Sequence, residues 1–435
     1  MQTYRSYLPS GADYFEVAPA HWLVAPGMLA LTENRRDNKG MKESQVLSLS
    51  YGRIIVKAEE KLVGLVPESF ETYQLAMPGD IIIRCTDLQN DQASLRTGLV
   101  KDRGIITSAY LCLGVREGFQ NRYIHYLLHL LDISKAIYKL GSGLRQNLSF
   151  GDFKRLPILK PSYEEQLLIA DYLDQKSAQI DQAIQIKERQ IERLKERKQI
   201  LIQQAVTRGL DPHAPMRDSD VEWIGEIPAH WQTRRFKYLF SQSQLPVRPG
   251  DGVVTSYRDG QVTLRSNRRL AGYTEAILEG GYQGVRKGQL VLNSMDAFEG
   301  AIGVSESDGK CTPEYVVCDS LSGDYLPEYF AYLLREMALA RYIQVICNAV
   351  RQRAVRIRFN NLASRFMVVP PIEEQRAIVA HIKAETEKQG TAVALLEQQI
   401  SKLKEYKATL INSAVTGKIK VPGVVEPQAQ DMEVA

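Results

Sequence analysis

Several polar stretches of the sequence combine arginine with asparagine or glutamine, the side chains best suited to reading bases in DNA. Arginine pairs with guanine, and asparagine or glutamine with adenine, through two hydrogen bonds in the major groove. Such stretches lie at 32–40, 84–92, 256–260 and 264–269. Any one of them alone would be an ordinary solvated surface, but their recurrence in both halves of the chain favours base reading. The candidate base-reading residues are Asn34, Arg35, Arg36, Arg84, Asp87, Gln89, Asn90, Tyr257, Arg258, Arg265, Asn267, Arg268, Asn293 and Asp296.

Two denser clusters of basic residues stand at "GSGLRQNLSFGDFKRL" (141–156) and "AVRQRAVRIRFNN" (349–361). The arginines of the second cluster fall on neither one strand face nor one helical stripe, so we expect a basic loop that leads into an element. Contact with DNA phosphates is the natural use of such a loop, and an acidic protein partner is the alternative. The candidate backbone-contact residues are Arg145, Gln146, Asn147, Arg351, Gln352, Arg353 and Arg356.

The motifs of common nucleotide-dependent enzymes are absent from the sequence. It contains no GxxxxGK[ST] phosphate loop and no GxGxxG after a strand. The pair Pro370-Pro371 lacks the preceding Asn or Asp and the following aromatic residue of adenine methyltransferases. The histidines and cysteines show no metal-ligand spacing, and a nuclease-like Glu-x-Lys triplet at 59–61 has no partner acid that the sequence places beside it. We therefore expect no catalytic residue and no metal site.

The composition is that of a soluble globular protein with more than one domain. The chain has 435 residues, of which 44% are hydrophobic and 24% charged. A net charge of +4 permits a nucleic-acid partner without requiring one. The cysteines form no CxxC pair, which fits a reducing compartment, and there is neither a signal-peptide pattern nor an apolar run of roughly 18 residues. We expect a cytoplasmic protein.

An internal repeat with an offset of 209 residues shows which elements must position these side chains. Two units, about 19–210 and 228–420, fill nearly the whole chain. The ends of the units match closely, whereas the stretches between them share a rhythm but few residues. This indicates two modules that do one kind of job on two different targets. The recurring motifs are "PAHW" at Pro19–Trp22 and Pro228–Trp231, "EEQ" at Glu164–Gln166 and Glu373–Gln375, and "AVT" at Ala205–Thr207 and Ala414–Thr416.

Each unit ends in a predicted helix with an apolar stripe whose spacing alternates between four and three residues. This spacing is typical of a coiled-coil seam. Two separate amphipathic helices are the alternative, but a stripe this narrow is better buried by a similar helix, and antiparallel pairing would relate the units by a pseudo-two-fold axis. A helix over 180–207 would be about 42 Å long, close to the roughly 34–36 Å of one DNA turn. The predicted seam is Ile180, Ile184, Lys187, Ile191, Leu194, Lys198, Leu201 and Ala205 with Gln389, Val393, Leu396, Ile400, Leu403, Lys407, Leu410 and Ala414.

The stretches 32–140 and 241–345 each read as short strands with turn signals, followed by a helix. This order predicts an α+β fold. The predicted boundaries are a first strand-rich domain at 1–157, a helical region at 158–218, a second strand-rich domain at 219–366, a second helical region at 367–420, and a disordered tail at 421–435.

Taken in order and in duplicate, these elements resemble the specificity subunit of a type I restriction-modification system over essentially the whole chain. Two departures are a weaker opening of the first unit at "FEVAPAHW" (15–22) and the replacement of Gly-Ser-Gly by "NAVRQRAV" (348–355) in the second. The motifs that carry the resemblance are "IGEIPAHWQ" (224–232), "GSGLRQNL" (141–148), "LPILKPSYEEQ" (156–166), "MVVPPIEEQ" (367–375) and "ILIQQAVTRGL" (200–210).

The resemblance implies two target recognition domains separated by a long antiparallel coiled-coil pair. Each domain would read one half of an asymmetric bipartite site in double-stranded DNA, with a spacer set by the helices. The implied partners are two methylation subunits, which use S-adenosylmethionine to modify adenine, and restriction subunits, which use ATP and Mg. The chain itself would be a non-catalytic subunit without a cofactor. A coiled-coil scaffold that binds proteins without reading bases is the alternative function.

Overall fold

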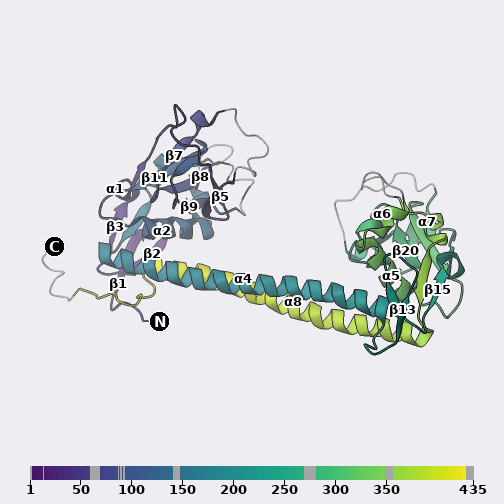
Figure 1. Ribbon diagram of the computed structural model, residues 1–435. Helices are drawn as coiled ribbons and strands as arrows, with labels where there is room; N and C mark the ends of the chain where they lie inside the picture. Colours follow the sequence, from purple (N-terminus) through teal and green to yellow (C-terminus); the bar gives the residue numbers. More distant parts are fainter. Residues whose placement is uncertain are drawn as a thin grey trace. The chain divides into compact units, whose positions relative to one another are not determined.

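The computed structural model describes residues 2–12, 14–58, 69–86, 88, 91, 94–140, 147–268, 281–347 and 356–427. The chain divides into two compact units. Unit 1 combines Met1–Lys187 with Glu397–Ala435, and unit 2 is Glu188–Leu396. Each unit therefore holds one strand-rich domain, called domain 1 or domain 2 below, together with parts of both long helices (Figure 1).

Domain 1 is built around an antiparallel sheet of four strands in the order β4-β11-β8-β9. Smaller two-stranded sheets pair β1 with β2, β3 with β12, β5 with β6, and β7 with β10. The elements are β1 Tyr7–Ala12, β2 Phe15–Pro19, β3 Leu23–Pro26, α1 Gly27–Ala30, β4 Leu31–Glu33, β5 Leu47–Ser50, β6 Arg53–Val56, η2 Phe70–Thr72, β7 Gln74–Ala76, β8 Ile81–Arg84, β9 Thr97–Leu99, β10 Gly104–Ile106, β11 Tyr110–Val115, α2 Asn121–Ile133, η3 Ala136–Lys139, α3 Phe150–Lys154 and β12 Pro157–Lys160.

The core of domain 1 is formed by its four-stranded sheet and by α2, which packs against β9. The run Ile81–Ile83 is fully buried, because a central strand covered on both faces favours a continuous run of β-branched residues. Helix α2 begins with the side chain of Gln120 accepting a hydrogen bond from the N–H of Tyr123, and it buries Tyr123, Leu127 and Leu131. The candidate residues at the end of β8 thus follow directly on a buried strand.

Domain 2 repeats the same plan, with a four-stranded antiparallel sheet in the order β16-β23-β20-β21. Its smaller sheets pair β13 with β14, β15 with β24, β17 with β18, and β19 with β22. The elements are β13 Met216–Asp218, β14 Glu226–Pro228, β15 Gln232–Arg235, η4 Phe236–Tyr238, β16 Phe240–Gln242, β17 Val254–Ser256, β18 Val262–Leu264, η5 Arg265–Asn267, β19 Gln283–Val285, β20 Leu290–Asn293, η6 Ala297–Glu299, β21 Ile302–Val304, β22 Gly309–Cys311, β23 Tyr315–Ser320, α5 Pro327–Leu339, α6 Tyr342–Ile346, α7 Phe359–Ala363 and β24 Phe366–Val369.

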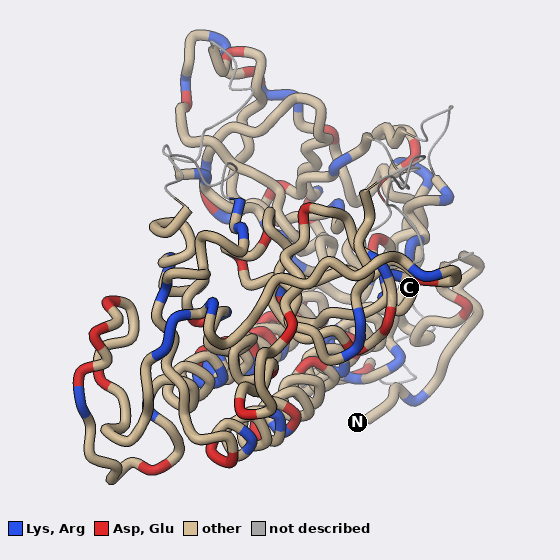
Figure 2. Tube along the Cα trace, turned by 90° about the vertical axis from the view of Figure 1, so that its right-hand side faces the viewer, with Lys and Arg blue, Asp and Glu red and all other residues tan. Residues whose placement is uncertain are grey.

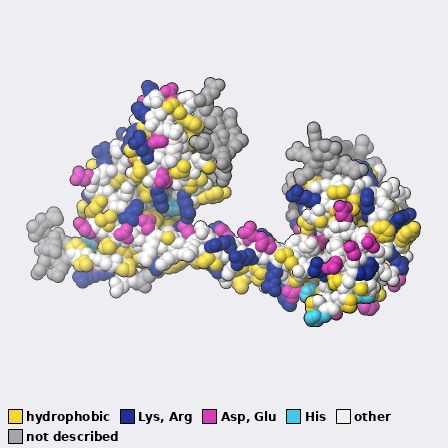
Figure 3. Space-filling view, in the orientation of Figure 1, with side chains coloured by type: hydrophobic (Ala, Val, Ile, Leu, Met, Phe, Trp, Pro, Cys, Tyr) yellow, Lys and Arg dark blue, Asp and Glu magenta, His cyan; other side chains and the backbone are white. Residues whose placement is uncertain are grey.

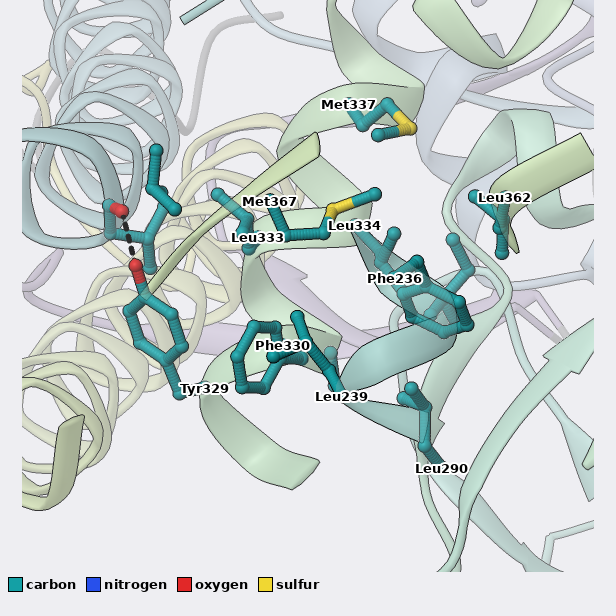
Figure 4. Close-up of a cluster of buried hydrophobic side chains, with 14 of the residues drawn as sticks. Phe236, Leu239, Leu290, Tyr329, Phe330, Leu333, Leu334, Met337, Leu362 and Met367 are labelled. Carbon is teal, nitrogen blue, oxygen red and sulfur yellow. Dashed lines mark hydrogen bonds between the residues drawn. The ribbon is translucent and has the colours of Figure 1, made fainter. Parts of the chain in front are cut away.

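A continuous hydrophobic core joins α5 of domain 2 to its sheet and to the long helices. Phe330 and Leu334 of α5 lie near Phe236 and Met367 in this cluster (Figure 4). The hydroxyl of Tyr329 donates a hydrogen bond of 2.9 Å to the carbonyl oxygen of Val206, marked by the dashed line in Figure 4. Domain 2 is therefore fixed to the helix that precedes it in the chain through both apolar packing and a buried hydrogen bond.

The two long helices are α4, Tyr163–Arg208, and α8, Ile372–Val415. In unit 1, Lys407 of α8 donates to Asp181 of α4 at 2.8 Å, and Lys187 donates to Gln399 at 2.6 Å. In unit 2 the end of α4 at Ile202 shares a core with the start of α8 at Ile378 and Ile382. Within each unit, late residues of one helix thus meet early residues of the other, which is antiparallel contact. The prediction of an α+β chain with two long helices is confirmed.

The narrow apolar stripe predicted for these helices faces inward. All the predicted seam positions of both helices are buried or half-buried. Both basic and acidic residues occur along the two helices (Figure 2). The seam lysine Lys407 also connects the helices to domain 1, because its partner Asp181 pairs with Arg53 of β6 as well. One carboxylate therefore ties both helices to domain 1.

The repeated tetrapeptide and the repeated EEQ motif meet in a structure that we call the domain–helix joint. In unit 1 this joint consists of Tyr4, His21, Trp22 and Glu165. The Glu165 carboxylate accepts hydrogen bonds from Tyr4 Oη at 2.6 Å, Trp22 Nε1 at 3.0 Å and His21 Nε2 at 3.0 Å. Burial and the bond to Glu165 raise the pKa of Tyr4, so its hydroxyl stays a donor. The motif is repeated because each strand-rich domain must be fastened to the start of a helix.

In unit 2 the corresponding joint is looser. His230 Nε2 lies 2.8 Å from Glu374 Oε2, but Trp231 Nε1 has no hydrogen-bond partner among the described residues. The glutamines of the two motifs play the same part in both units. Gln166 accepts from the N–H of Gln120, and Gln375 accepts from the N–H of Leu326, so each glutamine binds the backbone at the start of the domain's main helix.

The first half of the predicted disordered tail is ordered instead, which corrects that expectation for 421–427. Val421 and Val424 are buried, and the carboxylate of Glu426 accepts a hydrogen bond from the N–H of Arg5. Lys420 also pairs with Gln2 in a β-bridge. The segment is held because it packs beside the N-terminal residues of unit 1; the rest of the predicted tail, 428–435, lies outside the described residues.

Candidate nucleic-acid interface

The predicted DNA-contact residues divide into those that the structure describes and those that lie outside the described residues. The latter are Asp87, Gln89, Asn90, Arg145, Gln146, Arg351, Gln352 and Arg353. The described ones gather after β8 and β4 in unit 1, and around the β17–β18 hairpin and the end of β20 in unit 2.

In unit 1 the chain leaves β8 at Arg84 and returns to the sheet at β9. The Arg84 guanidinium donates to Asp91 Oδ2 at 2.9 Å. Hydrogen bonds from the N–H and the hydroxyl of Ser94, with the nearby Arg84, lower the pKa of Asp91 to about 2. The carboxylate therefore stays charged at neutral pH and holds one side of a candidate base-reading arginine.

The described parts of the two basic clusters begin at Asn147 and Arg356, directly beside these strand ends. In unit 1 the N–H of Leu148 donates to the carbonyl oxygen of Cys85 at 2.9 Å. In unit 2 the hydroxyl of Ser294 donates to the carbonyl oxygen of Ile357 at 2.6 Å, and the N–H of Ile357 donates back to Ser294. The two pairs are related by the same offset as the sequence repeat. Asn147 and Arg356 directly precede Leu148 and Ile357, so in each unit these two described members of the basic cluster lie next to the residues that follow the central strand.

The candidates that follow β4 are held against the start of β8. Arg36 Nη1 lies 2.6 Å from Asp80 Oδ2, and Asn34 Nδ2 lies 2.9 Å from Asp80 Oδ1. The bond to Asp80 raises the pKa of Arg36. Arg35 between them has a side chain that is 82% exposed and pairs with Glu33. Asn34 and Arg36 are thus both bound to the Asp80 carboxylate, and Arg35 is the more accessible side chain of this stretch.

In unit 2 the candidates form a network of exposed ion pairs. Arg258, at the tip of the β17–β18 hairpin, pairs with Asp296 at 3.0 Å and with Glu299. Those two carboxylates raise the pKa of Arg258. Asn293 Nδ2 lies 3.3 Å from the other oxygen of Asp296. The hairpin tip is therefore tied to the chain that follows β20.

The remaining candidates of unit 2 are Tyr257, directly after β17, and Arg265, Asn267 and Arg268, in η5 and directly after it. Arg268 pairs with Asp259 at 2.8 Å, and its guanidinium carbon lies 4.1 Å from the centre of the Tyr257 ring. Arg265 Nε lies 3.3 Å from Thr255 Oγ1, and Asn267 Nδ2 lies 2.9 Å from Thr263 Oγ1. The stacked arginine is pre-oriented, which lowers the entropy that it loses when it binds a base or a phosphate.

Exposed ion pairs of this kind exchange readily for other partners, because each contributes only about 0–1 kcal/mol. On the face shown in Figure 3, lysines and arginines are mixed with acidic residues over each unit. Binding would therefore depend on local arginine sites more than on a uniform basic field. The described residues contain no group of three or more His, Cys, Asp or Glu that could hold a metal ion, and no described helix is long and apolar enough to cross a membrane.

The sequence reasoning included Asp296, which pairs with Arg258, but it missed the other acidic partners of the candidate arginines. Asp91 and Asp259 stand inside the polar stretches already selected, so acids interspersed among arginines were the available signal. Glu299 and Asp80 lie outside those stretches, and only the folded sheet brings them near Arg258 and Arg36. Arg96 and Tyr138, which hold the backbone after β8 from beneath, were missed as well.

The two units repeat one scaffold, and arginines stand at the ends of its strands. Comparisons with known proteins show which proteins share this plan. Residues 36–196 match the family described as the type I restriction modification DNA specificity domain. A curated type I restriction enzyme specificity subunit of Methanocaldococcus jannaschii is 23% identical over 430 residues, covering 95% of each chain.

Two solved structures show the same fold. One, from work on complex assembly and conformational transition of a type I restriction-modification system, has a TM-score of 0.64 at 15% identity and covers 92% of this chain and 99% of that one. The other, the HsdS subunit from Thermoanaerobacter tengcongensis, has a TM-score of 0.50 at 15% identity, with coverage of 92% and 98%. The comparisons thus confirm the resemblance to specificity subunits of type I restriction-modification systems that the motifs predicted. The names of these relatives agree with the prediction of a specificity subunit.

Proposed function

We propose that this chain reads an asymmetric bipartite site in double-stranded DNA, with domain 1 and domain 2 each recognising one half-site. The observation that carries the proposal is the repeated arrangement beside the central strand of each domain. Leu148 bonds to Cys85, and Ile357 bonds to Ser294, so each domain joins the residue after Asn147 or Arg356 to the end of the same strand. Around this shared frame the polar side chains differ, as two different half-sites would require.

The proposal assigns two roles to the candidate residues. Side chains at the strand ends and the hairpin tip, such as Arg35, Arg84, Arg258 and Arg265, would read bases, and the basic clusters at 145–147 and 351–356 would contact phosphates. The antiparallel helix pair would separate the two recognition domains and set the length of the spacer between half-sites. The internal repeat would then relate the two domains by a pseudo-two-fold axis.

The same proposal covers the partners that would carry out chemistry. Two methylation subunits would dock on the chain and modify adenine with S-adenosylmethionine. Restriction subunits would join them for ATP- and Mg-dependent cleavage in the cytoplasm. This chain would supply neither cofactor nor catalytic group, and its role would be to recognise the target sequence in the DNA.

Binding to DNA libraries, measured with the methylation subunits present, tests the function. Arg258→Ala should reduce discrimination at one half-site about tenfold and leave the other unchanged, because one good arginine–base pair contributes about 1–3 kcal/mol. Arg356→Ala should weaken binding to all sequences alike and lower the slope of log affinity against log salt by about 1. Arg376→Ala is the control, since Arg376 lies on α8 in an exposed pair with Glu373.

The alternative function is a coiled-coil scaffold that binds proteins and reads no bases. It predicts equal affinity of the complex for all duplexes, and normal partner binding by the arginine variants. A complex that binds every duplex equally at physiological salt would refute sequence recognition by this chain.

A further inference from the structure

Arg96 is a fully buried arginine that stands directly before β9 and beneath the backbone that follows β8. Its guanidinium donates to the carbonyl oxygens of Thr86 at 2.8 Å, of Arg84 at 3.3 Å, and of Asp91. The planar guanidinium carries five donors in a rigid arrangement, so one side chain can bind several carbonyl groups of an irregular backbone at once. Arg96 thus connects both ends of the segment that carries Arg84 and its partner Asp91.

A second group fixes the arginine itself. Its Nε donates to the hydroxyl of Tyr138 at 3.0 Å, and that hydroxyl donates to the carbonyl oxygen of Asp91 at 3.3 Å. The guanidinium carbon lies 5.1 Å from the centre of the Tyr138 ring. The N–H of Arg96 donates to the buried carboxylate of Asp132 at the end of α2. The helix, the 3-10 turn and the strand therefore all hold Arg96 in one place.

Domain 2 shows why domain 1 needs such a group. Between β20 and β21 the chain has eight residues, 294–301, whereas between β8 and β9 it has twelve, 85–96. The shorter connection contains the turn η6, which is held by backbone hydrogen bonds. The N–H of Glu299 donates to the carbonyl oxygen of Asp296, and the N–H of Gly300 donates to the carbonyl oxygen of Ala297. Gly300 has φ +95°, which suits glycine at this turn. The longer connection in domain 1 has its two ends bridged by a buried side chain.

Burying a charge is costly unless its donors are satisfied, and here backbone carbonyls and a tyrosine hydroxyl satisfy them. The return for that cost is a fixed position of the backbone at Arg84 and Asp91. We propose that Arg96, supported by Tyr138, is a positioning residue that aims Arg84 at its base and so determines specificity at one half-site without touching DNA. This inference rests on the proposed function of domain 1 as a DNA reader.

The test compares Tyr138→Phe and Arg96→Lys with a matched control in the same domain. Tyr126→Phe is the control, because the Tyr126 hydroxyl bonds to Asp174 of α4 at 2.6 Å and not to the Arg84 segment. Sequence preference is measured for the complex with its methylation subunits. Tyr138→Phe should lower discrimination at the half-site read by domain 1 about tenfold and leave the other half-site unchanged, since that is within the range of one arginine–base pair. Arg96→Lys should lower it further, and Tyr126→Phe should leave both half-sites as in the wild type.

A double-mutant comparison separates positioning from a loss of stability. In an Arg84→Ala background the effect of Tyr138→Phe on base preference should disappear, because there is no longer an aimed side chain to misplace. Independent effects of the two changes would overturn the inference, as would unchanged half-site preference in folded Tyr138→Phe. A wild-type complex without any sequence preference would instead refute the proposed function. Tyr138→Phe removes a single hydroxyl, so it provides a result even if Arg96→Lys fails to fold.

Discussion

The domain–helix joint makes a quantitative prediction about Glu165, for which the duplicated chain supplies its own control. The Glu165 side chain is 5% exposed and its carboxylate accepts three hydrogen bonds, from Tyr4, His21 and Trp22. In Glu165→Gln the remaining oxygen can still accept from Tyr4 and Trp22, but both bonds lose their charge assistance. Hydrogen bonds to charged groups contribute about 1.5–3 kcal/mol, and neutral ones about 1 kcal/mol. The substitution should therefore destabilise unit 1 by about 2 kcal/mol.

The equivalent change in unit 2, Glu374→Gln, should cost less. Glu374 pairs with His230, whose side chain is 52% exposed, and exposed pairs contribute about 0–1 kcal/mol. Hydrogen exchange under mild denaturant gives the opening free energy of each unit separately, from amides at the start of α4 and the start of α8. Equal losses in the two variants, or no loss in Glu165→Gln, would refute the claim that a single buried carboxylate holds the first joint.

Two further predictions concern a glycine and a buried carboxyl. Gly417 has φ +71°, and a Cβ there would lie 2.4 Å from Pro19, so Gly417→Ala should destabilise the chain by at least about 1–2 kcal/mol. Gly390 lies in the middle of α8 with open space around it, so Gly390→Ala should stabilise the chain by about 1 kcal/mol. Urea unfolding measures both changes in the free energy of unfolding. Burial raises the pKa of Glu336 from 4.5 to about 7, so the folded chain holds a proton that the unfolded chain lacks between these pH values. The stability that this group contributes is fully present below about pH 4.5 and is lost as the pH rises through about 7. The free energy of unfolding of Glu336→Gln should therefore exceed that of the wild type by up to about 3 kcal/mol at pH 8 and match it near pH 4.5. A difference that does not change with pH would contradict this assignment.

The sequence by itself determined the features that depend on local pattern and on the repeat. The four-and-three spacing from Ile180 to Ala205 marks a helix with one apolar stripe, because burial of a helix face depends on side chains one turn apart. The offset between Pro19–Trp22 and Pro228–Trp231 likewise indicates two copies of one plan, since the same local frame had to be built twice.

Only the tertiary structure decided which distant groups meet. Glu165 binds His21 and Trp22, which lie more than a hundred residues away in the sequence. Asp181 pairs with both Arg53 and Lys407, and all of unit 2 lies between Asp181 and Lys407 in the sequence. Nothing in the spacing of these residues fixes such pairings, because they depend on how sheets, turns and helices pack in three dimensions. The same holds for Arg96, whose partners are backbone carbonyls that any sequence could supply and that only the fold of the chain after β8 brings within reach.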